Sequence, residues 1–476
     1  MFKNYIGGTW MESGQERPNI NPSDISDVIG TYAQADAGQV NSAVDAAVHA
    51  APAWSASTPQ QRFDVLDAVG SEILARKAEL GRLLAREEGK ILPEAIGEVV
   101  RAGFIFKFFA GEAVRTSGEH LKSVRPGIDI DVLRQPLGVV GLIAPWNYPI
   151  AIPSWKIAPA LAFGNCVVFK PAELAPGCSW ALAEIIARSG LPPGVFNLVM
   201  GSGRVVGNAL VSHPSIDGIS FTGSVEVGRQ IATQCGSRMK RVQLEMGGKN
   251  PLVVLDDADL GVAVNAAVNG SYFSTGQRCT ASSRLIVTAG IRGRFEKAVI
   301  DRLQTLKVDD ALAEGTEMGP VVDESQLQKD LEYVALARNE GGQLAYGGER
   351  LERPKNGFYM SPALITETTS GMRINREEVF GPVASLMMVK DYEEALSAAN
   401  DTKFGLSAGI CTTSLKYASH FRDNAAAGMV MVNLPTAGVD YHVPFGGRKG
   451  SNYGTREQGR YAMEFYTTVK TCYTAP

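Results

Sequence analysis

Hydrophobic and polar positions follow two different rhythms along the chain, and the rhythm changes near residue 137. Before this point, alanine-rich segments with helical periodicity predict helices at about residues 36–54, 58–77 and 86–114. After it, short apolar runs alternate with helical patterns. They predict strands at residues 138–143, 166–169, 195–199, 218–221 and 242–244, and helices at 152–162, 178–188, 204–211 and 225–235. This alternation indicates a parallel sheet covered by helices, which binds nucleotides at the carboxyl ends of its strands.

A second β/α series follows from residue 251 to residue 451. Its predicted strands cover residues 251–255, 284–287, 384–389, 409–411 and 429–432. The tail at residues 464–473 alternates like a strand but has no local partner, and such a strand often pairs with another element or another subunit. With 476 residues, the chain is expected to form two or more domains of α/β class.

Composition and charge exclude several functional classes. The net charge is −4, from 46 basic and 50 acidic residues, which does not fit a nucleic-acid-binding protein. The most apolar stretch, residues 137–152, is interrupted by Pro145 and Pro149 and does not predict a membrane span. No cysteine pair has CxxC spacing, so we expect no metal site and predict a reduced, cytoplasmic protein.

Cys279 lies in the polar segment Gly276-Gln277-Arg278-Cys279, unlike the other five cysteines, which lie in apolar or helical runs. A thiol becomes a nucleophile when it loses its proton, from a reference pKa of about 8.5. Arg278 could favour the thiolate, Gly276 permits close backbone approach, and a helix beginning after Cys279 would supply N–H donors. The alternative is a small buried residue, which is the usual role of a free cysteine.

Two further candidates lie where predicted strands end. Glu245 ends an apolar strand before two glycines, and partial burial would make it a base that activates water. Asn147 follows the first strand of the sheet, where its carboxamide could stabilise an oxyanion. Each also has a structural alternative, a solvated turn residue for Glu245 and an asparagine turn between prolines for Asn147.

Other strand ends carry groups that suit a dinucleotide. Lys170 and Glu173 offer a donor and an acceptor for a ribose, although charges at strand ends are usually only solvated. Gly223 and Ser224 precede a helix and could present N–H groups to a pyrophosphate, or could form an ordinary helix N-cap.

Taken together, these motifs resemble the aldehyde dehydrogenase superfamily over essentially the whole chain, in the family's order. The matching motifs are Pro145-Trp146-Asn147, Phe169-Lys170-Pro171-Ala172-Glu173, Phe221-Thr222-Gly223-Ser224, Leu244-Glu245-Met246-Gly247-Gly248-Lys249, Gly276-Gln277-Arg278-Cys279 and Glu377-Glu378-Val379-Phe380-Gly381-Pro382. The resemblance implies that Cys279 attacks the aldehyde, that Asn147 and the Cys279 N–H form the oxyanion hole, and that Glu245 activates the water that hydrolyses a thioester.

The resemblance also implies the cofactor site and the domains. Trp146, Lys170, Glu173, Gly223, Ser224, Glu378 and Phe380 would bind NAD or NADP. Glu173 favours NAD, because a carboxylate repels a 2′-phosphate; alternatively, Glu378 is a surface charge and Phe380 a core residue. The implied fold is a Rossmann-type NAD(P)-binding domain (residues 1–117 and 138–246), an α/β catalytic domain (247–449) and a small β oligomerisation arm (118–137 and 450–476). A homodimer or homotetramer is therefore expected.

The expected substrate is a carboxylated semialdehyde. Arg101 shares a helix face with Phe104, Ile105 and Phe108, and the resemblance places this helix along the substrate tunnel. Arg101 would bind a carboxylate, or alternatively would reach the surface or pair with Glu98. Trp155, Arg278, Phe445 and His442 complete the predicted substrate site.

The stretch Gly438-Val-Asp-Tyr-His-Val-Pro-Phe-Gly-Gly-Arg-Lys449 is similar to the 2-oxoglutarate semialdehyde (2,5-dioxopentanoate) dehydrogenases. A dehydrogenase for succinate semialdehyde or another aldehyde is the nearest alternative. The loop from Gly450 to Glu457 departs from the usual Ser-Gly-x-Gly-Arg-Glu, which argues against a generic aldehyde specificity. A CoA-acylating dehydrogenase, a thiol esterase and an inactive structural protein on this fold are the other candidates.

Overall fold

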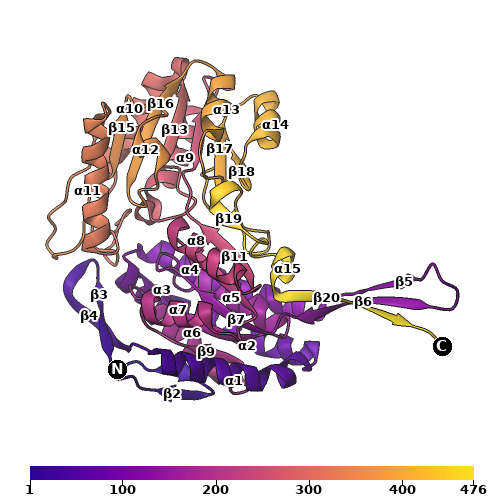
Figure 1. The fold of residues 1–476 in the computed structure, drawn as a ribbon. Helices are drawn as coiled ribbons and strands as arrows, with labels where there is room; N and C mark the ends of the chain where they lie inside the picture. Colours follow the sequence, from indigo (N-terminus) through magenta and orange to yellow (C-terminus); the bar gives the residue numbers. More distant parts are fainter.

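The computed structural model describes residues 1–476 and forms two α/β bodies, each built around its own sheet, with a long arm projecting from one of them (Figure 1). The α/β class and the two β/α series predicted from the sequence are confirmed. None of the helices combines the length and the apolar character that crossing a membrane requires.

The first sheet contains the five predicted parallel strands in the order β11-β10-β7-β8-β9. These strands are β7 (Val139–Ile143), β8 (Cys166–Lys170), β9 (Phe196–Leu198), β10 (Gly218–Gly223) and β11 (Arg241–Met246). The chain runs from β7 outward to β9, and then returns to β10 on the other side of β7. The loops after β7 and β10 therefore diverge and leave a crevice at the carboxyl ends of these two strands.

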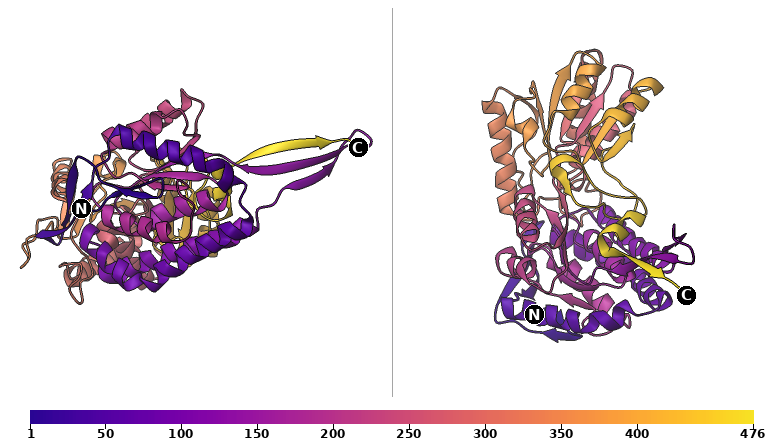
Figure 2. Two further views of the ribbon diagram at one scale, coloured as in Figure 1. Left: turned by 90° about the horizontal axis from the view of Figure 1, so that it is seen from below. Right: turned by 45° about the vertical axis from the view of Figure 1, so that its right-hand side comes forward.

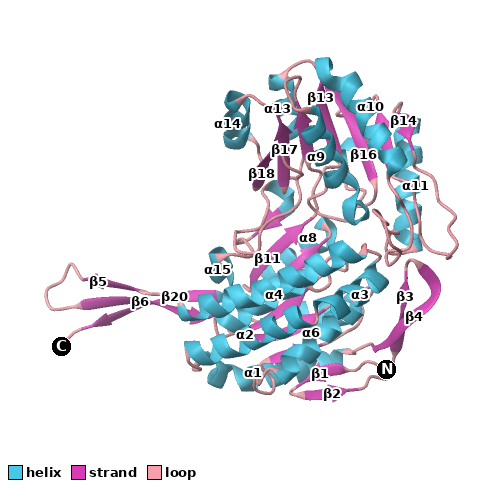
Figure 3. Ribbon diagram, turned by 180° about the vertical axis from the view of Figure 1, so that it is seen from behind, coloured by secondary structure: helices cyan, strands magenta, loops and turns pink.

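Helices cover both faces of this sheet, as Figure 3 shows from behind. They are α1 (Ala37–Ser55), α2 (Pro59–Ala75), α3 (Lys77–Glu88), α4 (Leu92–Val114), α5 (Ala151–Ala162), α6 (Pro176–Arg188), α7 (Asn208–Ser212) and α8 (Val225–Gly236). Local signals set their starts. The Asp36 carboxylate caps α1, and Thr58 and Gln61 form a capping box before Pro59.

The helix predicted for residues 86–114 is wrong at its start. Gly89 ends α3 with a left-handed backbone (φ 89°), and α4 begins at Leu92, so Arg86 belongs to the preceding helix. The ring of Pro320 and that of Pro22 lie within 2.9 and 3.1 Å of where a Cβ on Gly89 would stand. Only glycine combines this backbone with this close approach.

The second sheet contains the five strands of the second series and two that the sequence did not reveal. Its order is β14-β15-β16-β13-β12-β17-β18, parallel except for β14. The strands are β12 (Pro251–Val254), β13 (Arg284–Thr288), β14 (Gln343–Tyr346), β15 (Ala363–Thr366), β16 (Val383–Val389), β17 (Ser407–Cys411) and β18 (Met429–Val432). The associated helices are α9 (Leu260–Tyr272), α10 (Ala289–Thr305), α11 (Glu324–Asn339), α12 (Arg373–Arg376), α13 (Tyr392–Asn400) and α14 (Leu415–Asn424).

The N-terminal segment also contains strands that the sequence pattern missed. They are β1 (Asn4–Ile6), β2 (Thr9–Met11), β3 (Glu16–Asn21) and β4 (Asp24–Ala33). The first two extend the first sheet beyond β9, and the last two form a hairpin. The hairpin reaches the second body, where the Tyr359 hydroxyl donates to the Ser23 carbonyl at 2.7 Å and the Phe358 N–H donates to the Pro22 carbonyl at 3.0 Å.

The arm consists of β5 (Glu119–Lys122), β6 (Asp129–Pro136) and β20 (Thr467–Thr474), and Figure 2 shows how far it extends. The tail pairs with β6 in antiparallel register, so the strand expected without a local partner finds one in the hairpin. The expectation that all of residues 450–476 belong to the arm is wrong. β19 (Asn452–Tyr453) pairs with β11, and Phe465 and Tyr466, in α15 (Met463–Tyr466), pack in the core of the first body.

Replacing Gly89 by alanine should destabilise the protein by about 2 kcal/mol or more, because the residue adopts a left-handed backbone and abuts two proline rings. The midpoint of thermal unfolding measures this effect. Gly97→Ala is the matched control, since Gly97 lies in α4 and a methyl group added there would meet no neighbouring residue within 4 Å. The control should unfold at the same temperature or higher. Equal losses in both variants would contradict the explanation.

Candidate active site

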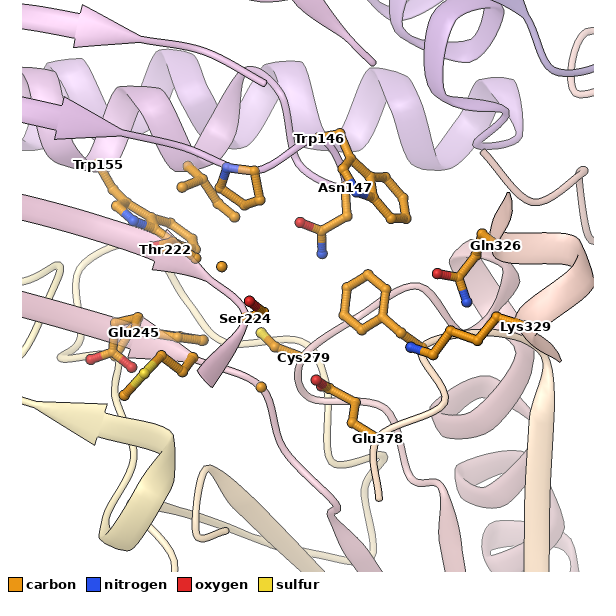
Figure 4. Close-up of a pocket in the computed structure, with 17 residues that line it drawn as sticks. Trp146, Asn147, Trp155, Thr222, Ser224, Glu245, Cys279, Gln326, Lys329 and Glu378 are labelled. Atoms are coloured by element: carbon orange, nitrogen blue, oxygen red, sulfur yellow. The ribbon is translucent and has the colours of Figure 1, made fainter. Parts of the chain in front are cut away.

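A cleft opens at the carboxyl ends of β7, β10 and β11, where the two bodies meet. In the view of Figure 4, Cys279 lies at its centre, with Glu245 and Trp155 on one side and Gln326 and Lys329 on the other. The residues that line it are Pro145, Trp146, Asn147, Ile152, Trp155, Thr222, Gly223, Ser224, Glu245, Met246, Gly247, Cys279, Gln326, Lys329, Glu378, Phe380 and Phe445.

Cys279 is the only one of the six cysteines in this cleft. Three consecutive residues before it, Ser274, Thr275 and Gly276, have left-handed backbones (φ 51°, 54° and 65°), and they turn the chain sharply into the site. A Cβ on Gly276 would stand 2.1 Å from the Gly381 carbonyl oxygen, so the close approach expected at this glycine is confirmed. The helix expected after Cys279 is wrong, because a turn leads from it to β13.

The thiol of Cys279 is protonated in the free protein at neutral pH. Burial and, to a smaller extent, the carboxylates of Glu378 and Glu245 raise its pKa to about 12, although the backbone N–H groups of Cys279 and Thr280 act in the opposite direction. The thiol therefore needs a base, or a change in its surroundings, before it can attack a carbonyl carbon.

Asn147 lies beside Cys279 on the loop after β7, and a buried lysine fixes this loop. The Asn147 carboxamide donates to the Gln277 carbonyl at 2.9 Å, and the Lys90 ammonium donates to the Asn147 carbonyl at 2.8 Å. Lys90 also pairs with Glu98 at 2.7 Å, and Glu98 accepts the Ile150 N–H at the start of α5. Lys90 and Glu98 are both almost completely buried. Sequence reasoning missed the connection of Lys90 and Glu98 to the candidate oxyanion donor, because nothing local links them to Asn147.

Glu245 lies near the end of β11 and is 1% exposed. Its Oε1 accepts from the Asn452 carboxamide, whereas its Oε2 has no hydrogen-bond partner. Burial raises its pKa well above the usual value, and the nearby Glu457 raises it further, while Lys156 lowers it. The structure excludes the solvated turn as an alternative for Glu245 and gives a carboxyl group that binds a proton more readily than an exposed one.

Lys156 and Glu457 form a buried ion pair behind Glu245. The Lys156 ammonium donates to Glu457 and, at 2.8 Å, to the Ser220 hydroxyl. Lys156 lies on α5, directly after Trp155, so this pair joins the wall of the cleft to the C-terminal segment.

Lys170 and Glu173 follow β8. Lys170 is 4% exposed, donates to the Pro171 carbonyl at 2.8 Å, and has a pKa that burial lowers to about 8. Glu173 accepts from the exposed Arg17 at 2.9 Å and from the Gly203 N–H at 3.1 Å. Lys170 is thus not the solvated strand-end charge of the alternative interpretation, whereas Glu173 is partly exposed.

Gly223 ends β10 and Ser224 is the N-cap of α8, with its hydroxyl 3.4 Å from the Val227 N–H. Both residues line the cleft. Ser224 is therefore an ordinary helix N-cap, and the same helix start is also exposed to an anionic ligand in the cleft. The hydroxyl of Thr222, which sequence reasoning did not single out, is buried there without a hydrogen-bond partner.

Glu378 and Phe380 precede β16 and face the cleft instead of the surface and the core. Glu378 accepts the Gly248 N–H at 2.9 Å, burial raises its pKa, and a Cβ on Gly247 would stand 1.9 Å from its Oε2. Phe380 has a left-handed backbone (φ 70°), and its ring lies edge to face with that of Trp146, with the ring centres 5.5 Å apart. The free Thr222 hydroxyl and the α8 N-terminus fit the pyrophosphate of a dinucleotide. The carboxylates of Glu173 and Glu378 fit its two ribose groups.

Trp155 and Phe445 line the cleft and stack with their ring centres 5.2 Å apart. The Arg101 guanidinium lies 5.6 Å from the Trp155 ring centre. Arg101 is partly exposed, and it does not form an ion pair with Glu98. Its hydrogen-bond partner is the neutral amide oxygen of Gln458, at 3.1 Å. Burial lowers the pKa of Arg101, and its Nε has no partner.

Two predicted substrate residues lie elsewhere. Arg278 turns away from the cleft and donates to the carbonyls of Asn269 and, at 3.1 Å, Gly270 near the end of α9. One guanidinium nitrogen, Nη2, is held there by backbone oxygens, and Arg278 is not among the residues that line the cleft with Cys279. His442 is exposed and does not line the cleft. Conversely, Gln326 and Lys329 reach the cleft from α11, a polar helix whose sequence contains no signal of a site.

Comparisons with known proteins agree with this arrangement. The model of the aldehyde dehydrogenase family matches residues 10–472. The chain belongs to the aldehyde dehydrogenase family. Two curated relatives are the alpha-ketoglutaric semialdehyde dehydrogenase of Bacillus subtilis, 44% identical over 100% of this chain and 98% of the relative, and the 2,5-dioxopentanoate dehydrogenase of Saccharolobus solfataricus, 41% identical over 99% of each.

A solved structure, the betaine aldehyde dehydrogenase of Staphylococcus aureus in complex with NAD+, superposes with a TM-score of 0.97 at 35% identity, and covers 100% of this chain and 95% of that one. The fold expected from the resemblance is confirmed. This aldehyde dehydrogenase is an oxidoreductase that uses a nicotinamide cofactor and acts on a small aldehyde.

The Cys279 thiol should be alkylated slowly at neutral pH in the cofactor-free enzyme. Because its pKa is raised to about 12, the thiolate fraction and the rate with iodoacetamide should rise about tenfold per pH unit from pH 7 to pH 10. Glu378→Gln removes a negative neighbour, lowers the pKa of the thiol and accelerates alkylation. Cys279→Ser reports the background from the other cysteines, and Glu332→Gln, an exposed carboxylate of α11, is the matched control. An alkylation rate that levels off below pH 8 would contradict the raised pKa of the Cys279 thiol.

Proposed function

We propose that the enzyme oxidises a carboxylated semialdehyde, 2-oxoglutarate semialdehyde (2,5-dioxopentanoate) in the first place, to the dicarboxylic acid with NAD. One observation supports this substrate class most strongly: the partly buried Arg101 guanidinium beside Trp155 donates to a neutral amide oxygen and forms no ion pair. A partly buried cation that forms no ion pair offers a binding site for an anionic ligand. The names of the two semialdehyde dehydrogenases among the relatives agree with this proposal.

In the proposed reaction, the Cys279 sulfur attacks the aldehyde carbon, and the carbonyl oxygen takes up the negative charge. The Asn147 carboxamide and the Cys279 N–H would donate to this oxyanion. Asn147 now donates one N–H to Gln277, which orients the carboxamide and leaves its second N–H for the substrate oxygen. Lys90 holds the backbone of Asn147, so the donor is positioned before the substrate arrives.

When bound, a nicotinamide cofactor would supply the oxidising chemistry as acceptor of the hydride that leaves the hemithioacetal carbon of the substrate. Glu245 then takes a proton from water, and the resulting hydroxide attacks the thioester carbon, which releases the acid and the thiolate of Cys279. The free Oε2 of Glu245 is the atom that would receive this proton. A CoA-acylating enzyme has less need of such a base, which favours hydrolysis.

The proposed cofactor site uses Trp146, Lys170, Glu173, Gly223, Ser224, Glu378 and Phe380. Glu173 and Lys170 would hold the adenosine ribose, the α8 N-terminus with Gly223 and Ser224 the pyrophosphate, and Glu378, Phe380 and Trp146 the nicotinamide end. The carboxylate of Glu173 favours NAD, since it would repel the 2′-phosphate of NADP, although the adjacent Arg17 partly offsets its charge.

We also propose a homodimer or homotetramer that works in the cytoplasm. The projecting arm exposes Leu133, Val469 and Tyr473, which a partner subunit would cover. Six free cysteines are consistent with a reducing compartment. The oligomerisation role applies to residues 118–137 and to the tail strand from residue 467.

Replacing Glu245 by glutamine should lower kcat by about 100-fold or more, because an amide cannot accept the proton of the hydrolytic water. A pre-steady-state burst of about one NADH per active site should remain, since the thioester still forms. Stopped-flow absorbance measures both phases. Glu332→Gln serves again as control and should keep the wild-type turnover. Wild-type kcat in Glu245→Gln would refute the role of this carboxylate.

Replacing Arg101 by methionine should lower kcat/KM for 2,5-dioxopentanoate and succinate semialdehyde about 100-fold more than for pentanal, because the carboxylate loses its ion pair. The measurement is a panel of these aldehydes with NAD and with NADP. Lys107→Met is the matched control, since Lys107 lies on the same helix and pairs with Asp67 at its partly exposed face. Equal losses for charged and neutral aldehydes would rule out carboxylate binding by Arg101.

A further inference from the structure

Gln458 is a completely buried residue held in an unusual conformation beside Arg101. It is 0% exposed and has a left-handed backbone (φ 57°), which is uncommon for glutamine. The preceding residue is fixed by its backbone, because the N–H and carbonyl of Glu457 pair with those of Phe445 at 2.9 and 2.7 Å. The side chain of Glu457 is fixed by the ion pair with Lys156. Immediately before Gln458, the chain is thus fixed to Phe445, which lines the cleft.

The hydrogen bond from Arg101 determines which way the Gln458 amide points. A guanidinium can only donate, so the atom 3.1 Å from Arg101 Nη2 must be the amide oxygen. The Nε2 group, which carries two donors, therefore faces away from Arg101. It is buried and has no partner.

Two more buried donors without partners belong to the same cluster. Arg101 Nε and Trp155 Nε1 also lack an acceptor, and the Arg101 guanidinium lies 5.6 Å from the Trp155 ring centre. A buried donor left unpaired costs about 1–3 kcal/mol, so three in one cluster around Trp155, which lines the cleft, indicate a ligand that brings several acceptors. Trp155 connects the cluster to the catalytic thiol, because it lines the same cleft as Cys279.

We propose that Gln458 is a specificity-determining residue that recognises the 2-oxo group of the substrate. Its Nε2 donates to the 2-oxo oxygen, while its Oε1 holds the Arg101 guanidinium against the adjacent carboxylate. This inference rests on the proposed oxidation of 2-oxoglutarate semialdehyde and adds the residue that distinguishes this substrate from other carboxylated aldehydes.

The chemistry of the cluster selects the head group. A 2-oxo acid presents only acceptors, namely two carboxylate oxygens and a carbonyl oxygen, and the free groups of Arg101, Gln458 and Trp155 are all donors. An aldehyde with an amino group at its far end would place a cation against Arg101, so the site rejects it by repulsion. An unsubstituted ω-carboxylated aldehyde satisfies Arg101 and leaves Nε2 of Gln458 unpaired.

Three aldehydes of five carbons isolate the contribution of Gln458: 2,5-dioxopentanoate, 5-oxopentanoate, which lacks only the 2-oxo oxygen, and pentanal, which carries no charge. The wild-type enzyme should have a kcat/KM for 2,5-dioxopentanoate at least tenfold above that for 5-oxopentanoate. In Gln458→Met, a change of similar length and volume, this ratio should fall to about one. Gln60→Met, an exposed glutamine of α2, should keep the wild-type ratio.

Gln458→Glu is the second variant, and it tests the link to Arg101. A carboxylate at this position would form an ion pair with the guanidinium and repel the substrate carboxylate. Both charged aldehydes should then lose about 100-fold in kcat/KM relative to pentanal. Thermal unfolding of each variant shows whether it is folded. If Gln458→Met does not fold, the Gln458→Glu result decides the inference.

The outcomes separate this inference from the proposed function. A wild-type enzyme that does not prefer either charged aldehyde over pentanal would overturn the proposed substrate class. A preference for both charged aldehydes, with a Gln458→Met loss equal for the two, would leave the substrate class intact and overturn the role of Gln458, since the residue would then only position Arg101. Unchanged rates for charged aldehydes in Gln458→Glu would overturn it as well.

Discussion

The buried ion pair between Lys156 and Glu457 is the interaction on which the geometry of the cleft depends. Lys156 belongs to α5, next to Trp155, and Glu457 belongs to the C-terminal segment, next to Gln458. Removing one partner of such a pair leaves an uncompensated buried charge, which costs about 3–5 kcal/mol. The pair therefore holds together two segments that are 301 residues apart, and each of them presents a side chain of the proposed substrate site.

The same ion pair influences the chemistry of Glu245. Glu457 raises the pKa of Glu245 and Lys156 lowers it, so the two members of the pair adjust the proton affinity of the proposed base in opposite directions. Burial raises this pKa more than either charge does. A carboxylate in these surroundings is a stronger base for water than an exposed one, because burial raises its pKa.

The sequence predicts the parts of this molecule in which burial acts on a continuous segment. Strands such as β7 and β8 are buried on both faces and appear as unbroken apolar runs, so they were predicted correctly. Strands β2, β3 and β14 are short and partly exposed, and their sequences do not differ from those of loops. The end of α3 at Gly89 depends on Pro22 and Pro320 from distant segments, so no local pattern could place it. Likewise, Cys279, Glu245 and Asn147 were found at turns and strand ends, whereas Gln326, Lys90 and the direction of Arg278 depend on tertiary packing.

Glu98 explains how Arg101 remains available for a substrate. The two residues are three positions apart on α4 and could pair, which was the alternative that the sequence left open. Instead, Glu98 binds Lys90 at 2.7 Å and accepts the N–H groups of Ile150 and Ala151 at 3.2 and 3.1 Å. These contacts satisfy its carboxylate and position the loop that carries Asn147. One buried carboxylate thus orders the proposed oxyanion donor and, because it is already engaged, leaves the guanidinium one turn away without a counterion.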